Sequence, residues 1–164
     1  MTTQTTDTAV QTSIVVEAPQ QLAFDVFTRD MASWWPPDHH ILGGELAEMV
    51  FEMRKGGRVY DVGVDGSTCQ WARVLEFDPP ERLVISWDIT PQWKLQTDPE
   101  KTSEVDFRFI AEDEGHTRIE LEHRHLDRHG DGWEAMRDAV GSPDGWNRGL
   151  RAFAERAQEV RGQS

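Results

Sequence analysis

The first forty residues alternate between apolar runs and breaks made of proline or polar residues. Residues 13–18 (SIVVEA) are rich in β-branched side chains, which predicts a strand. Pro19 stands where helices begin, and the mostly apolar residues 22–27 predict a helix of about three turns. The prolines within residues 34–40 (WWPPDHH) exclude one regular helix there, so we expect a short helical turn followed by a loop.

Residues 46–124 show the alternation of about six consecutive strands joined by turns. In residues 82–90, for example, Leu83, Ile85 and Trp87 share one face of the predicted strand. Turn-forming pairs such as Gly56-Gly57 separate neighbouring strands. The pattern predicts an antiparallel meander with one apolar side and one polar side.

The remaining residues return to a helical period. Trp133, Met136 and Val140 predict a short helix that ends at Gly141. After the pair Ser142-Pro143, which favours a helix start, apolar residues recur at helical spacing over about four to five turns. These residues are Trp146, Leu150, Phe153, Ala157 and Val160.

Together the elements predict an α+β fold. A curved antiparallel sheet of about seven strands would wrap around a long C-terminal helix, with one or two short helices after the first strand. Because one helix cannot fill the concave side of a curled sheet, we expect a cavity between sheet and helix that suits apolar ligands. We expect residues 1–12 to form a flexible tail and residues 13–164 to form a single domain.

Several segments carry a family resemblance. In chain order they are Trp34-Trp35-Pro36 with His39, residues 51–60 (FEMRKGGRVY), residues 73–84 (RVLEFDPPERLV), Trp87, residues 117–124 (TRIELEHR) and Gly145-Trp146. They resemble the START-like helix-grip proteins of the SRPBCC superfamily, in the branch of the activator of heat-shock-protein-90 ATPase. Met53, Ala72 and His125 depart from the residues usual in that branch. The superfamily holds lipid carriers, cyclases, hydrolases, self-resistance proteins and co-chaperones, so the resemblance implies the fold and leaves the activity open.

Charge and cysteine content narrow the possible roles. The chain has 164 residues and a formal net charge of −13 at pH 7, which disfavours binding to nucleic acids or membrane surfaces. Its single cysteine, Cys69, excludes a disulfide framework, and we expect a buried, unreactive thiol. No apolar run approaches a membrane-spanning length, and no secretory signal begins the chain. We therefore expect a soluble, cytoplasmic protein whose sheet edges allow a homodimer.

Two candidate acid–base sites lie on predicted strands. His123 and His125 are two residues apart, so both imidazoles should leave the inward face, either in the pocket or at the rim of the core. Glu52 shares a strand face with Arg54, and an ion pair there would pin the hairpin. Burial of Glu52 at a cavity mouth would instead raise its pKa and make it a general base. No metal site, nucleotide-binding loop or hydrolase motif stands out, and no cofactor is expected.

The candidate ligand-binding residues combine inward sheet positions with the stripe of the last helix. They are Trp35, Trp87, Phe107, Phe109, Leu121, His123, Trp146 and Leu150. The sequence thus predicts binding of a small hydrophobic molecule, with His123 as its polar anchor. Two alternatives remain: an enzyme of the polyketide-cyclase or hydrolase type that uses His123 or Glu52 as general acid or base, and a co-chaperone-like module that binds a protein partner.

Overall fold

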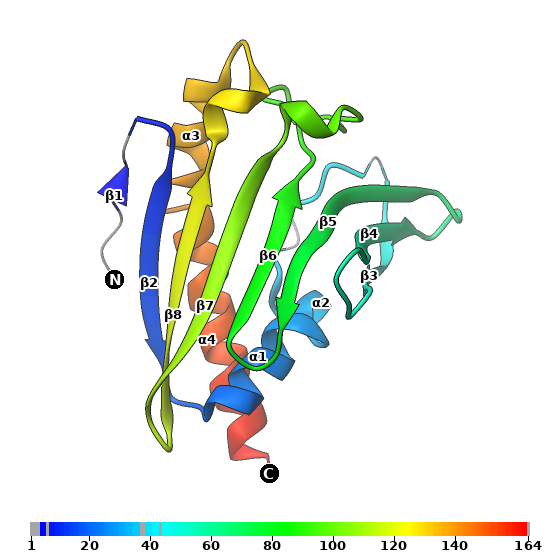
Figure 1. Ribbon diagram of the computed structural model, residues 1–164. Coiled ribbons are helices and arrows are strands. Elements are labelled where there is room, and N and C mark those ends of the chain that lie inside the picture. Colours follow the sequence, from blue (N-terminus) through cyan, green and yellow to red (C-terminus); the bar gives the residue numbers. More distant parts are fainter. Residues whose placement is uncertain (1–3, 6, 37–38, 43, 164) are drawn as a thin grey trace.

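The computed structural model describes the chain except for residues 1–3, 6, 37–38, 43 and 164. Its centre is one antiparallel sheet with the strand order β1-β2-β8-β7-β6-β5-β4-β3 (Figure 1). The strands are β1 (Gln4–Thr5), β2 (Val10–Val16), β3 (Leu46–Phe51), β4 (Arg58–Gly63), β5 (Thr68–Asp78), β6 (Arg82–Trp87), β7 (Ser103–Asp113) and β8 (His116–Arg124). Strands β3 to β8 follow one another both along the chain and across the sheet, which confirms the predicted meander.

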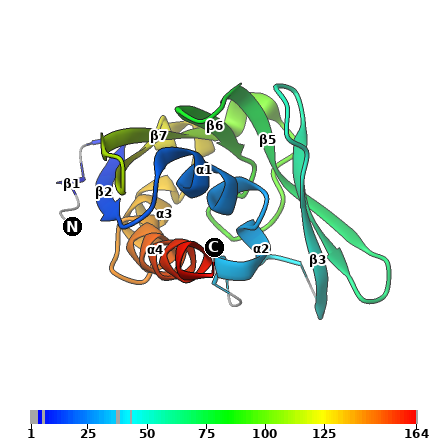
Figure 2. The ribbon, with the colours of Figure 1, turned by 90° about the horizontal axis from the view of Figure 1, so that it is seen from below.

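The helices lie on the concave side of this sheet. They are α1 (Gln20–Thr28), α2 (Met31–Trp34), α3 (Trp133–Val140) and α4 (Trp146–Gly162), with the 3-10 turns η1 (Pro99–Lys101) and η2 (Leu126–His129). Helices α1 and α4 contact each other, and Figure 2 shows the sheet curling past both of them. The predicted helix-grip architecture is therefore confirmed. None of the helices in the described ranges has the length and apolarity needed to cross a lipid bilayer.

The sheet has one strand more than the expected seven, and its second strand begins early. The two residues of β1 pair with β2, and β2 itself starts at Val10 rather than at residue 13. The sequence hides this start because Thr12, a polar residue, occupies an inward position. Thr12 is buried, and its hydroxyl donates a hydrogen bond to Asn147 Oδ1 on α4 at 2.8 Å. Residues 4–5 and 10–12 of the expected tail thus belong to the sheet.

Phenylalanines fill the space between α1, α4 and the middle of the sheet. The Phe27 ring has its centroid 4.7 Å from Phe107, 5.3 Å from Phe109 and 5.1 Å from Phe153. Phe24 packs edge-on to Phe109 at 5.0 Å. All five side chains are almost fully buried, and tilted or edge-to-face contacts of this kind stabilise a core beyond simple area burial.

The opposite face of the sheet carries charges. Asp106 on β7 accepts hydrogen bonds from Arg82 and Arg124 on the two neighbouring strands, at 2.9 and 3.0 Å. Although burial raises its pKa, these two guanidinium groups outweigh that effect, so the pKa of Asp106 is lowered. The polar side of the sheet is therefore held by cross-strand ion pairs, as the alternation predicts.

Candidate functional site

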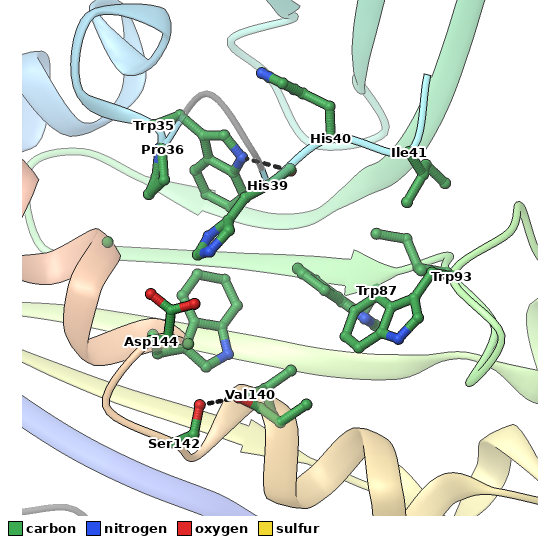
Figure 3. Close-up of a pocket in the computed structure, with 15 residues that line it drawn as sticks. Trp35, Pro36, His39, His40, Ile41, Trp87, Trp93, Val140, Ser142 and Asp144 are labelled. Atoms are coloured by element: carbon green, nitrogen blue, oxygen red, sulfur yellow. Dashed lines mark hydrogen bonds between the residues drawn. The ribbon is translucent and has the colours of Figure 1, made fainter. Parts of the chain in front are cut away.

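A cavity of about 360 Å³ opens between the sheet and the helices (Figure 3). Three stretches of chain form its wall: the loop after α2, the end of β6 with the loop that follows it, and the α3–α4 connection. The lining residues are Trp35, Pro36, His39, His40, Ile41, Trp87, Ile89, Trp93, Ala139, Val140, Ser142, Asp144, Gly145, Trp146 and Gly149. The wall is mainly apolar, with a few polar groups, which is the usual composition of small-molecule sites.

Local sequence features hold two of these stretches in place. Helix α2 stops at Trp34, and Pro36 disfavours a helical conformation for Trp35, whose backbone is extended. The chain then folds back, so that Trp35 Nε1 donates a hydrogen bond to the carbonyl oxygen of His39 at 3.0 Å. On the other side, the Ser142 hydroxyl donates to the carbonyl oxygen of Ala139 at 2.7 Å and closes the end of α3. The cavity therefore lies between two segments that these hydrogen bonds hold to nearby residues.

Indole rings make up the floor of the cavity. The centroid of Trp146 lies 5.9 Å from that of Trp35 and 5.4 Å from that of Trp87. Behind them, Trp71 contacts Trp35 at 5.1 Å and Trp87 at 5.9 Å. All four rings are buried to more than nine-tenths, so their positions are set by one another. Such a floor offers flat aromatic surface to a bound molecule.

A buried chain of hydrogen bonds leads from Trp146 into the sheet. Trp146 Nε1 donates to His123 Nδ1 at 3.1 Å, and Ser103 Oγ lies 2.7 Å from the Nε2 atoms of both His123 and His129. Because His123 Nδ1 accepts, a neutral His123 carries its proton on Nε2 and donates it to Ser103. The Ser103 hydroxyl can then donate to His129. The chain thus fixes the orientation of the Trp146 ring.

The imidazoles of His123 and His129, the two histidines in this hydrogen-bonded chain, are neutral near pH 7. Burial lowers the pKa of His123 to about 3, with a further contribution from His129 nearby. Burial also lowers the pKa of His129 to about 4, against an opposing effect of Asp88. His123 is fully buried and does not line the cavity, so it reaches a ligand only through Trp146.

The structure separates the two histidines that the spacing places together. Strand β8 ends at Arg124, and His125 adopts a left-handed backbone with φ of 62° at the start of η2. The alternation of strand faces therefore stops before His125, which corrects the expected shared face. His129, which follows in the 3-10 turn, joins His123 instead.

Glu52 lies in the β3–β4 hairpin, away from the lining residues of the cavity. Its carboxylate accepts hydrogen bonds from the backbone nitrogen and the guanidinium of Arg58, at 2.9 and 3.0 Å, and it also contacts Arg54. The side-chain hydrogen bond from Arg58 is the main reason that the pKa of Glu52 is lowered. This is the opposite of the direction that a general base requires, and it agrees with a structural role in the hairpin.

The expected ligand-binding residues fall into two groups. Trp35, Trp87 and Trp146 line the cavity. The others, namely Phe107, Phe109, Leu121, Leu150 and His123, are at most 2 % exposed and lie in the core instead. Phe107 and Phe109 point inward as the alternation predicts, but Phe27 on α1 packs against both rings, so protein side chains occupy the space there. His123 is covered by the rings of Trp87 and Trp146.

Several lining residues lie where no periodicity could indicate them. His39, Trp93 and Asp144 stand in loops, and Figure 3 shows the His39 ring and the Asp144 carboxylate turned toward the same part of the cavity. The available signal was the prolines, because they mark loops: Pro143 precedes Asp144, and two prolines lie two and three residues before His39.

A second polar cluster lies behind the cavity. His40 Nδ1 is 3.2 Å from Asp61 Oδ2, and Trp71 Nε1 donates to Asp61 Oδ1 at 3.3 Å. Burial raises the pKa of Asp61, although His40 and Trp71 oppose the shift. Cys69 is buried as expected, and burial, with Asp61 nearby, raises the pKa of its thiol. Within the described part of the chain, no three His, Cys, Asp or Glu side chains are grouped so as to hold a metal ion.

Comparisons with known proteins match this architecture. Residues 17–158 match the family described as activator of Hsp90 ATPase homolog 1-like protein. A solved structure of Txn09, an anthrahydroquino-gamma-pyrone synthase, is 40% identical to this chain. The match covers 90% of this chain and 96% of that one, with a TM-score of 0.65. CalC from Micromonospora echinospora, a self-sacrificing resistance protein, is 29% identical over 94% of this chain and 96% of its own, with a TM-score of 0.65. No curated protein matches the chain.

Proposed function

Because the chain belongs to the family of activator of Hsp90 ATPase homolog 1-like proteins and carries a cavity in its helix-grip fold, we propose that it binds a flat, largely apolar small molecule there. The observation that carries this proposal is the cavity of about 360 Å³ with Trp35, Trp87 and Trp146 in its wall. Buried indoles provide rigid aromatic area at low entropic cost, so a fused-ring ligand gains most from this wall.

The similarity to Txn09 supports the same class of ligand. The name of Txn09 denotes a fused aromatic product. This chain is 40% identical to Txn09, and the match covers 90% of this chain. Anthraquinone-2-sulfonate is therefore a suitable probe, because it is flat, tricyclic and water-soluble. We expect saturable quenching of tryptophan fluorescence as the probe fills the cavity.

A pair of glycines on α4 makes the test specific. Gly149 lines the cavity, and a Cβ placed there has its nearest contact at 4.0 Å, so the backbone tolerates a side chain. Gly149→Leu fills the cavity and should weaken binding of the probe at least about tenfold. Gly162→Leu is the matched control, because a Cβ there meets nothing within 4 Å. Equal affinity in the two variants, or no saturable binding to the unmodified protein, would refute the proposal.

The identity to a synthase also favours a second candidate, ring closure within the cavity. His39 is the group that would accept a proton from a phenol as its oxygen attacks a carbonyl carbon of the same molecule, since its ring projects into the cavity (Figure 3). This assignment replaces His123, which lies outside the wall, and Glu52, which is held by Arg58.

An ortho-hydroxyaryl diketone, which closes to a γ-pyrone with loss of water, tests this candidate. The protein should accelerate the appearance of pyrone absorbance, and His39→Gln should slow it by about a hundredfold. Glu52→Gln is the control and should keep the rate. If the unmodified protein gives no acceleration over buffer, ring closure is refuted while the binding proposal stands.

A further inference from the structure

One wall residue has a hydrogen-bond donor with no acceptor. Trp87 is 7% exposed, and its Nε1 is buried without a partner among the described residues. A buried N–H left unpaired is unfavourable, and such groups are rare in folded proteins. The position of this donor in a cavity wall therefore calls for an explanation.

The other buried tryptophans all donate to an acceptor within the protein. Trp34 donates to the carbonyl oxygen of Val26 at 3.1 Å. Trp35, Trp71 and Trp146 donate to His39, Asp61 and His123, at 3.0, 3.3 and 3.1 Å. The fold thus supplies an acceptor for four of the five buried indoles and leaves Trp87 without one. Packing alone does not account for that difference, because these five rings form one contiguous cluster.

The Trp87 ring is held on several sides. Its centroid lies 5.2 Å from the His123 ring, 5.4 Å from Trp146 and 5.9 Å from Trp71. These neighbours prevent the ring from turning its nitrogen toward another acceptor. Figure 3 shows this nitrogen on the side of the cavity where Trp93 projects. The nitrogen itself has almost no exposed surface, so a ligand oxygen reaches it only when a neighbouring wall residue shifts. Trp93 is such a residue, because it is 44% exposed on a loop and lies outside the core.

We propose that Trp87 Nε1 donates a hydrogen bond to an oxygen of the ligand, so that the cavity selects flat aromatic molecules with a ring carbonyl or phenolate oxygen. This inference rests on the proposed binding function and specifies its ligand class. An indole nitrogen is a donor only, so it pairs with an acceptor such as a carbonyl or phenolate oxygen and not with a group that can only donate, such as an ammonium. A ligand without this oxygen leaves the donor unpaired, and sites built in that way discriminate strongly.

Two probes of nearly equal shape test the inference. Anthraquinone-2-sulfonate has ring carbonyls, whereas anthracene-2-sulfonate lacks them. In the unmodified protein the quinone should bind about tenfold more tightly than the anthracene, as expected for one buried hydrogen bond. In Trp87→Phe this ratio should fall to about one, mainly through weaker quinone binding. Trp71→Phe is the matched control, because that indole already has an acceptor in Asp61, and it should keep the ratio.

A spectroscopic measurement covers the case in which Trp87→Phe does not fold. In the unmodified protein, the indole N–H resonance of Trp87 should move downfield when the quinone is added and should not do so with the anthracene. If both probes bind and the ratio is the same in Trp87→Phe, or the resonance does not respond to the quinone, the inference is refuted and the binding proposal stands. If neither probe binds, both are refuted.

Discussion

The two halves of the hydrophobic core differ in chemistry and in packing. Under α1 the core consists of phenylalanines, such as Phe24, Phe27 and Phe109, which have no polar atom. Toward the α3–α4 connection it consists of tryptophans together with His123. The cavity opens in the tryptophan half, whereas the phenylalanine half is filled by its own side chains.

This difference shows how one core can be filled by its own side chains at one end and carry a cavity at the other. A phenylalanine ring can be enclosed from all sides without leaving a hydrogen-bonding group unpaired. Each buried indole instead needs an acceptor, which brings polar groups such as His123 and Asp61 into the interior. Those groups restrict how the rings can pack, and the space that remains is available to a ligand. Four predictions probe the contrast.

The largest effect is expected in the phenylalanine half. Phe27→Ala removes a ring that contacts four other rings and should lower the free energy of unfolding by about 3–5 kcal/mol in a urea titration. The conservative change Phe27→Leu should cost much less. A loss below about 1 kcal/mol for Phe27→Ala would show that this half is not the packed part of the core.

The tryptophan half should be the part of the core that is sensitive to acid. The folded state lowers the pKa of His123 to about 3 and of His129 to about 4, whereas an unfolded histidine titrates near 6.5. As the pH falls below about 6.5, only the unfolded chain takes up these protons, so folding stability decreases. At pH 5 each histidine should cost about 2 kcal/mol relative to pH 7.5. Above pH 7.5 these two histidines are neutral in both the folded and the unfolded state, so they cost no stability there.

A glutamine variant isolates this effect. His129→Gln keeps a group that can bond to Ser103 but removes one titration, so about half of the pH-dependent loss due to the pair should disappear in urea titrations at the two pH values. His125→Gln is the control, because His125 lies outside the hydrogen-bonded chain. An equal pH dependence in His129→Gln and the unmodified protein would contradict the assignment.

A smaller effect is expected at Trp146, whose ring contacts Phe107 and so joins the two halves of the core. Trp146→Phe keeps an aromatic ring but leaves His123 Nδ1 without its donor, which should lower stability by about 1–2 kcal/mol. Affinity for a flat probe should also fall, since the ring is no longer held in the wall. Trp133→Phe, outside the buried cluster, provides the comparison for the loss of an indole. If both variants unfold at the same temperature, the His123 hydrogen bond is not stabilising.

The smallest effect is expected at Glu52. Glu52→Gln loosens the contact with Arg58 in the β3–β4 hairpin but touches neither half of the core. Thermal unfolding should shift only slightly, because exposed ion pairs contribute little. Probe affinity and any turnover should be unchanged. A marked loss of probe affinity or of turnover would show that Glu52 has a functional role.

The sequence was informative where side chains follow a period and uninformative where they do not. Alternation located β3 to β8, and helical spacing located Trp146 and Leu150 on one face of α4. The same alternation predicts that Phe107 points inward. It does not predict which part of the sheet α1 covers, so it could not tell inward residues of the filled core from those of the cavity wall. His39 and Asp144 lie in loops, whose course depends on tertiary contacts.

The contact between Trp35 and Trp146, 5.9 Å between ring centroids, joins the end of α2 to the start of α4. The wall of the cavity is therefore complete only when the start of α4 packs against the loop after α2. A molecule bound in the cavity would favour this packed arrangement, so it should hold the start of α4 against the loop after α2. Limited proteolysis within α4 should accordingly be slower in the presence of anthraquinone-2-sulfonate, which makes digestion of this helix a measure of probe binding.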